Sequence, residues 1–260
     1  MSDRYLFVDA GHLRYYRDTM RDWFGEEPDL EYGTLKANAF KCFHYDCLDD
    51  LPRSGEGDPD RQTRIAMQEA EFSRIRSIPG THVRLGSLTG SDKNRRQKEV
   101  DIQLAVDMLN HAVRHNMKYA VLLSGDRDFK PVIETLVEMG LYVEVHGDFR
   151  HTSSALAGAA DFYRPLTILD YFHWSSERQK NAHPIPQIAF SVPDTTGCQL
   201  LRHGNTRDIQ AKLYRDRGNN YLFVGETASQ TIHLRIPDEQ RLSLFLRHHF
   251  GEIHWVSAAA

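Results

Sequence analysis

The chain is poor in cysteine and lacks any long hydrophobic run. Its three cysteines, Cys42, Cys47 and Cys198, are odd in number, and the spacing between the first two matches no common zinc motif. We therefore expect reduced, structural cysteines. No apolar run approaches the ~20 residues that span a bilayer, and the first residues carry no signal-peptide pattern. These absences predict a cytoplasmic protein with no membrane partner.

An excess of positive charge is absent too. The 260 residues carry a formal net charge of −4, with 40% hydrophobic and 26% charged residues. This composition is typical of a globular domain. It excludes a protein that binds polyanions through its bulk charge, so any affinity for nucleic acid has to come from local basic patches.

The most informative segment of the chain is 119–129. Its apolar residues 120–123 predict a buried strand of a parallel sheet, and Asp126 and Asp128 follow directly after Ser124-Gly125. In open α/β sheets, ligands bind in the crevice beyond the carboxyl ends of the strands. The pattern thus favours a hard-cation site at this strand end.

Two further carboxylates occupy similar positions. The predicted strand 4–8 runs into Asp9, and a strongly helical pattern over 98–109 has Asp101 in its first turn. A carboxylate after a strand can also cap a helix or form a turn, and Asp126 and Asp128 together could cap the helix predicted over 131–139. Four acids at the ends of three elements favour a shared site over separate caps.

Close carboxylates repel each other unless a cation lies between them. Oxygen-only ligands suit Mg²⁺ or Mn²⁺ rather than Zn²⁺. Such a metal activates water and polarises a phosphoryl oxygen, which predicts phosphodiester hydrolysis. A phosphatase of the haloacid dehalogenase type is a rival, but it needs an Asp two residues after the first, where this chain has Gly11.

Three motifs resemble those of one known family. Phe7-Val-Asp9-Ala-Gly-His12-Leu, Gln97-Lys-Glu-Val-Asp101 with the helix that follows, and Leu123-Ser-Gly-Asp126-Arg-Asp128-Phe are similar to the NYN nucleases, a branch of the PIN-like metal-dependent ribonucleases. The resemblance spans about residues 4–172. It implies a Mg²⁺- or Mn²⁺-dependent endoribonuclease.

The resemblance also implies roles for single residues. Asp9, Asp101 and Asp126 would hold one or two metal ions, and Asp128 would orient the attacking water or complete a second metal site. Asp107 is a weaker candidate of the same kind. The family usually has Asn where this chain has His12, which could hydrogen-bond the substrate or Asp9 in its place. A nuclease acting on DNA and a catalytically silent RNA-binding or scaffold protein are the alternatives.

A short basic run precedes the helix that carries Asp101. Positive charge beside an acid cluster suits the docking of a phosphate backbone, although most charged runs of this kind are only solvated loops. Arg127 and His12 are further candidates for RNA contact. The predicted RNA-binding residues, whether the RNA is single-stranded or structured, are Lys93, Arg95, Arg96, Lys98, His12 and Arg127.

Strands that alternate with helices predict an α/β fold with a parallel, wound sheet. By analogy with PIN-like folds, the sheet would have five strands in the order 3-2-1-4-5, which makes the strands that precede Asp9 and Asp126 neighbours. Residues 1–172 would form the nuclease domain and the proline-bearing residues 173–198 a linker. Residues 199–260 would form a small β-rich module with a hairpin at 215–220, a contact for RNA, for a homodimer or for a protein partner.

Overall fold

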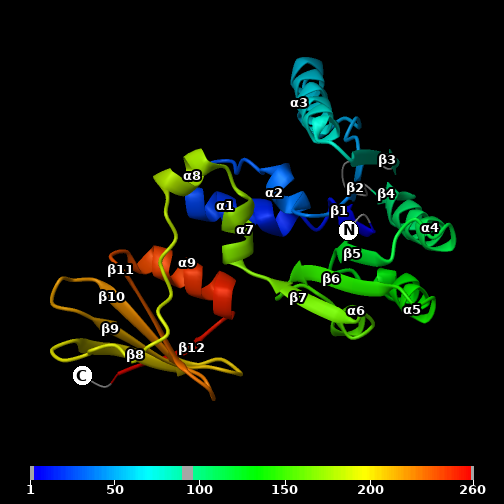
Figure 1. Ribbon diagram of the computed structural model, residues 1–260. Coiled ribbons are helices and arrows are strands. Elements are labelled where there is room, and N and C mark those ends of the chain that lie inside the picture. The colour runs from blue at the N-terminus through cyan, green and yellow to red at the C-terminus, as the bar shows by residue number, and fades with distance from the viewer. Residues whose placement is uncertain (1–2, 90–95, 259–260) are drawn as a thin grey trace. The chain divides into compact units, whose positions relative to one another are not determined.

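The computed structural model describes residues 3–89 and 96–258 (Figure 1), with side chains described outside 87–89 and 96–98. The chain divides into two compact units. The first contains residues up to 16 and 31–166, and the second contains 17–30 and the residues from 167 on. Within the described ranges, no helix is long and apolar enough to cross a membrane.

The first unit is built on a mixed sheet with six parallel strands, in the order β3-β2-β1-β5-β6-β7, and an antiparallel edge strand β4 beside β3. Figure 1 shows β1, β5, β6 and β7 side by side in this order. Its elements are β1 (Arg4–Asp9), the first turn of α1 (Arg14–Phe24, which belongs to the second unit from residue 17 on), α2 (Tyr32–Lys36), β2 (Lys41–Cys47), α3 (Asp58–Ser77), β3 (Thr81–Thr89), β4 (Arg96–Lys98), α4 (Val100–Val113), β5 (Tyr119–Leu123), a 3₁₀ turn (Arg127–Phe129), α5 (Lys130–Glu138), β6 (Tyr142–Asp148), α6 (Ser154–Ala157) and β7 (Phe162–Leu166).

The predicted α/β class and the order of the first five parallel strands are confirmed, but the number of strands was wrong. The sequence Phe162-Tyr-Arg-Pro-Leu166 forms a sixth parallel strand, β7, which pairs with β6 from Glu144↔Phe162 to Asp148↔Leu166. Its residues are mostly exposed, so they lack the continuous apolar run that marks a buried strand. β4 was also not predicted, and it lies in the basic run.

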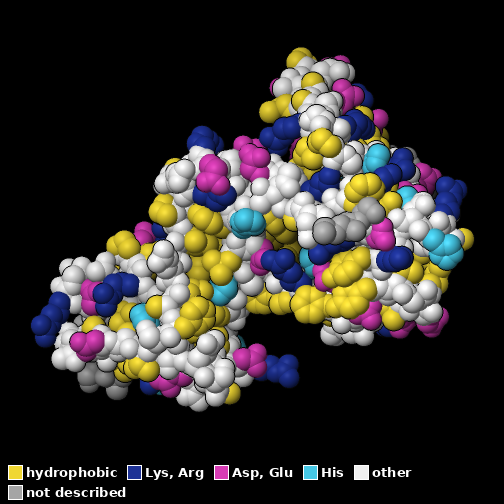
Figure 2. Space-filling model, in the orientation of Figure 1, with side chains coloured by type: hydrophobic (Ala, Val, Ile, Leu, Met, Phe, Trp, Pro, Cys, Tyr) yellow, Lys and Arg dark blue, Asp and Glu magenta, His cyan; other side chains and the backbone are white. Residues whose placement is uncertain are grey.

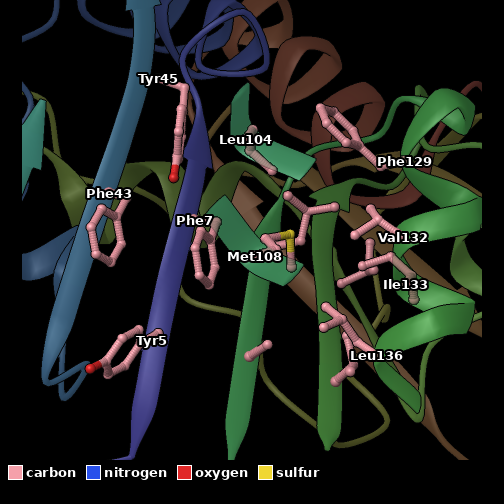
Figure 3. Packing of buried hydrophobic residues seen from close by; sticks show 14 of the residues in the cluster. Tyr5, Phe7, Phe43, Tyr45, Leu104, Met108, Phe129, Val132, Ile133 and Leu136 are labelled. Atoms are coloured by element: carbon pink, nitrogen blue, oxygen red, sulfur yellow. The ribbon is translucent and has the colours of Figure 1, made fainter. Parts of the chain in front are cut away.

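The main core of this unit lies between one face of the sheet and the helices α4, α5 and α6. Side chains from β1, β2, β5 and β6 meet residues of these helices, and most of them are less than 3% exposed. Figure 3 shows Phe7 between Phe43 and Met108 of α4, with Ile133 and Leu136 of α5 over the neighbouring strands. This packing fixes α4, and with it Asp101, against the strands that carry the other acids.

The second unit contains a five-stranded antiparallel sheet in the order β11-β10-β9-β8-β12. The predicted hairpin is present between β9 and β10, and the Asp216 carboxylate accepts the N–H groups of Gly218 and Asn220 in its turn. Strands β8 and β12 were not predicted. The elements are α7 (Ile168–Trp174), α8 (Glu177–Ala182), β8 (Gln199–Asn205), β9 (Gln210–Arg215), β10 (Tyr221–Glu226), β11 (Thr231–Ile236), α9 (Glu239–Phe250) and β12 (His254–Ser257).

The predicted linker, residues 173–198, contains helix α8 and a fully buried glutamine. The Gln179 side chain accepts the N–H of Asp29 at 2.8 Å and donates to the carbonyl of Glu27 at 2.9 Å. Residues 17–30 and 167–182 are therefore tied together within the second unit. The domain boundaries at 172 and 198 stay a prediction, as do the cytoplasmic location and the contact of the C-terminal residues with RNA, a second copy or a partner.

Candidate active site

Three of the four predicted acids line one cleft at the carboxyl ends of the parallel strands. Asp9 is the last residue of β1, Asp126 follows β5, and Asp101 lies in the first turn of α4. β1 and β5 are paired in parallel up to Val8↔Leu123, so their ends lie at the same edge. The cleft has a volume of about 550 Å³. Its lining residues are Asp9, Gly11, His12, Arg14, Tyr15, Asp101, Ser124, Gly125, Asp126, Arg127, Arg150, His151, Thr152 and Ser153.

Ser124 connects two of these acids. Its hydroxyl donates to Oδ2 of Asp9 at 2.8 Å and accepts the N–H of Asp126 at 3.2 Å, and the residue is fully buried. The other oxygen of Asp9 accepts the N–H of Gly11 at 2.9 Å. The Asp9 carboxylate is thereby held in one orientation before any ligand enters the cleft.

Asp126 caps a 3₁₀ turn, whereas α5, the helix that Asp126 and Asp128 were alternatively expected to cap, has no side-chain cap. Oδ1 of Asp126 accepts the N–H of Asp128 at 2.9 Å at the start of the 3₁₀ turn. Asp128 is exposed and does not line the cleft, although its charge raises the pKa of Asp101. Asp107 lies elsewhere, where it accepts hydrogen bonds from Tyr45 and Arg84 at 3.0 and 3.3 Å.

The acids of the cleft oppose each other's ionisation. Burial raises the pKa of Asp9 to about 6, with further contributions from the charges of Asp101 and Asp126, against the hydrogen bonds from Ser124 and Gly11. Burial, then the charges of Asp126 and Asp128, raise the pKa of Asp101. A cation among these carboxylates would favour their charged forms.

The donor set fits Mg²⁺ or Mn²⁺ by its chemistry. In the part of the chain that the structure describes, no three or more His, Cys, Asp or Glu side chains are grouped so that they could hold a metal ion. Mg²⁺ does not need such a group, because it usually keeps several waters and binds through one or two carboxylates together with substrate phosphates. Asp9, Asp101 and Asp126 supply such carboxylates to one cleft.

Positive and aromatic groups line the same cleft as the acids. Arg127 is the one arginine of the cleft lining that was predicted from the sequence to contact RNA. Arg14 and Tyr15 come from the start of α1, while Arg150 and His151 follow the end of β6. The rule that parallel strands end at one edge would have pointed to Arg150 and His151, because β6 is the strand next to β5.

His12 is a buried, neutral link between two loops. Its ring is 6% exposed, and its Nε2 accepts the N–H of Asp148 at 2.9 Å. Burial, which disfavours the charged ring, lowers the pKa of His12 to about 4. A hydrogen bond from His12 to the substrate or to Asp9 was predicted. The Nε2 atom has the Asp148 backbone as its partner, and contact of His12 with the substrate stays a prediction.

The basic run before α4 is described only in part. Lys93 and Arg95 lie outside the described residues. Arg96 and Lys98 belong to β4, which pairs with β3 from Ser87↔Lys98 to Thr89↔Arg96, and their side chains are not described. Contact of these four residues with RNA stays a prediction.

Gly125 allows two loops to approach each other beside Asp126. A Cβ atom there would lie 2.9 Å from the carbonyl oxygen of His151 and 3.0 Å from Cα of Thr152. We expect Gly125→Ala to lower the free energy of unfolding by about 1–3 kcal/mol, as overpacking does. Gly33→Ala is the matched control, because nothing lies within 4 Å of its Cβ position. Equal stability of both variants in urea unfolding would contradict this packing.

Comparison with known proteins supports the family resemblance. The model of the NYN domain matches residues 48–167, a range that contains Asp101, Asp126 and Asp128 and begins after Asp9. No curated protein matches the chain. A solved structure of a protein of unknown function from Vibrio parahaemolyticus is similar at 17% identity, with a TM-score of 0.43, over 67% of this chain and 97% of that chain.

Proposed function

We propose that this chain, which carries an NYN domain at residues 48–167, is a metal-dependent nuclease that hydrolyses phosphodiester bonds of RNA. The observation that supports this function best is the cleft itself. Asp9, Asp101 and Asp126 line it at the carboxyl ends of the parallel strands, and arginine side chains line the same space. Carboxylates for a cation and cations for a phosphate are the two sets of groups that phosphodiester hydrolysis needs.

The three acids of the cleft would hold the divalent ion. When bound, Mg²⁺ or Mn²⁺ supplies Lewis-acid stabilisation of the phosphoryl oxygens and lowers the pKa of water. Asp9 is oriented for this role by Ser124 and Gly11. Asp128 is outside the cleft lining, and its charge raises the pKa of Asp101, so it would act from outside the cleft as a further negative charge that favours a bound cation.

The arginines of the cleft would bind the phosphate backbone. Arg14, Arg127 and Arg150 contribute positive charge beside the acids, and a guanidinium group matches the geometry of a phosphate. Figure 2 shows Lys and Arg interspersed with Asp and Glu over the visible face. With a net charge of −4, attraction of a polyanion depends on such local groups, and binding should weaken as salt rises.

The choice of RNA follows the NYN family, and cleavage of matched substrates tests it. Labelled single-stranded RNA and DNA of one sequence would be incubated with the full chain and Mg²⁺, then with Mn²⁺. We expect RNA to be cut faster, at internal bonds. Cutting of DNA alone would reassign the substrate. Binding of RNA without cutting would favour a silent RNA-binding or scaffold protein, and an absence of both would contradict the proposed function.

A further inference from the structure

His151, which lines the cleft, forms a pair with the buried Asp148. Nδ1 of His151 is 2.8 Å from Oδ1 of Asp148, and the His151 side chain is 42% exposed whereas that of Asp148 is 1% exposed. A carboxylate accepts from Nδ1–H, which fixes the tautomer and leaves Nε2 as the second nitrogen. Nε2 of His151 has no hydrogen-bond partner among the described residues.

Asp148 is held as an anion. Although burial alone would raise its pKa, the Arg150 guanidinium and the His151 ring hold the pKa of Asp148 below its ordinary value. Arg150 binds both carboxylate oxygens, with distances of 3.2 Å from Nε to Oδ1 and 3.0 Å from the terminal nitrogen to Oδ2. The backbone N–H of Asp148 is bound by His12. The carboxylate therefore provides a fixed acceptor for the histidine.

The His151 ring is also fixed by stacking. Tyr15 lies parallel to it, with ring centroids 4.1 Å apart and an interplanar angle of 10°. The backbone beside the ring is joined to the end of β5, because Ser153 N–H donates to the carbonyl of Gly125 at 3.0 Å. An imidazole oriented by a carboxylate, packed against an aromatic ring and open to a cleft has the arrangement of an acid–base group.

We propose that His151, oriented by Asp148, is the general acid that protonates the leaving oxygen during phosphodiester cleavage. The inference rests on the proposed nuclease function. The oxygen of an attacking water forms a bond to phosphorus while the bond from phosphorus to the leaving oxygen breaks. Nε2–H of the imidazolium gives its proton to that oxygen. The water releases a proton to solvent, and the ring regains one from solvent, so atoms and charge balance.

His12 lines the same cleft but is not suited to this role. Its Nε2 is used by the Asp148 backbone, and its ring is almost fully buried. Asp9, Asp101 and Asp126 are distinct from the pair as well, because the His151 ring has Asp148 as its hydrogen-bond partner and Tyr15 as its stacking partner. A proton donor distinct from the metal-holding acids is thus present.

Substrates with sulfur in place of a bridging oxygen test the inference. A thiolate leaves without protonation, so loss of a general acid slows cleavage of the oxygen substrate and spares the sulfur substrate. RNA oligonucleotides with one oxygen, 3′-sulfur or 5′-sulfur linkage would be cut by the full chain and by His151→Gln, whose amide can still donate to Asp148. His173→Gln, at an exposed histidine of α7 outside residues 199–260, is the matched control, and His151→Asn is the second variant.

We expect His151→Gln to cut the oxygen substrate about 100-fold more slowly than the unmodified chain and to cut one of the two sulfur substrates within about threefold of it. The control variant should be unchanged on all three. An equal loss on every substrate, or no loss, would overturn the general-acid role and leave the nuclease function standing. If the unmodified chain cuts none of them, the proposed function fails, and this inference fails with it.

Discussion

Replacement of Asp126 by Asn is expected to lower kcat/KM for RNA cleavage by about 100-fold or more, since loss of a metal-holding carboxylate exceeds the 10–100-fold typical of its supporting partners. The fold should be retained. The side-chain oxygen of the introduced asparagine can still accept the N–H of residue 128, which Asp126 does at 2.9 Å, so the thermal unfolding midpoint should move little. Initial rates under subsaturating substrate give the comparison.

Asp107→Asn is the matched control for this variant. Asp107 is also an acid, but Tyr45 and Arg84 bind it outside the cleft lining. We expect this variant to cleave at the rate of the unmodified chain. Cleavage by Asp126→Asn at that rate would contradict the site assignment. An equal loss of cleavage rate in Asp107→Asn would show that a place in the cleft lining is not what makes an acid necessary for cleavage.

Replacement of Asp9 by Asn is expected to abolish cleavage and yet to stabilise the metal-free protein at pH 7. The pKa of Asp9 is raised from 3.8 to about 6, which at 1.36 kcal/mol per pKa unit bounds the effect at about 3 kcal/mol. Because the residue is partly exposed, we expect a gain of about 1–2 kcal/mol, or a few degrees in the unfolding midpoint. The oxygen of the introduced amide can still accept the N–H of Gly11, and its NH₂ group can donate to the Ser124 hydroxyl in place of the bond that this hydroxyl donates to Asp9.

The sign of this effect follows from proton binding. A raised pKa means that the folded chain binds the Asp9 proton more tightly than the unfolded chain, so this group lowers stability as pH rises from about 4 to about 6. The difference between Asp9→Asn and the unmodified chain should therefore be small near pH 4 and full above pH 6. Thermal unfolding at a series of pH values, in EDTA, measures it.

Added Mg²⁺ should reverse the order of stability. A cation that binds the folded chain raises its stability in proportion to the logarithm of its concentration above Kd, and the variant lacks one of the carboxylates that would bind it. The unfolding midpoint of the unmodified chain should rise with Mg²⁺ while that of Asp9→Asn stays nearly constant. Equal shifts in both proteins, or a variant less stable at pH 7 in EDTA, would contradict the electrostatic account.

The sequence predicted those parts of the fold in which the local pattern of apolar and polar residues matches their burial in the folded chain. Residues 120–123 form an apolar strand in which successive side chains, on both faces of the sheet, are all buried, so the run alone identified β5. The motifs at Asp9, Asp101 and Asp126 then placed three elements at one edge. Pairing of β1 with β5 follows from the strand order, which the family resemblance supplied.

Residues whose neighbours come from distant segments could not be predicted in this way. The strand β7 has exposed side chains and a proline, so only its pairing with β6 defines it. β12 pairs with β8 across about fifty residues of sequence, and no turn links the two. The sequence around Arg150 and His151 predicts only a polar loop. Their place in the cleft depends on the contacts of both residues with Asp148 and on the stacking of His151 with Tyr15.

The central claim is that the acids of the cleft act through a divalent cation, and chelation tests it most directly. Cleavage of labelled single-stranded RNA by the unmodified chain would be followed in Mg²⁺, after addition of EDTA, and after excess Mg²⁺ or Mn²⁺ is restored. We expect cleavage to stop on chelation and to resume on restoration, with Asp126→Asn inactive throughout. Cleavage that continues unchanged in EDTA, or that Asp126→Asn retains, would contradict the claim.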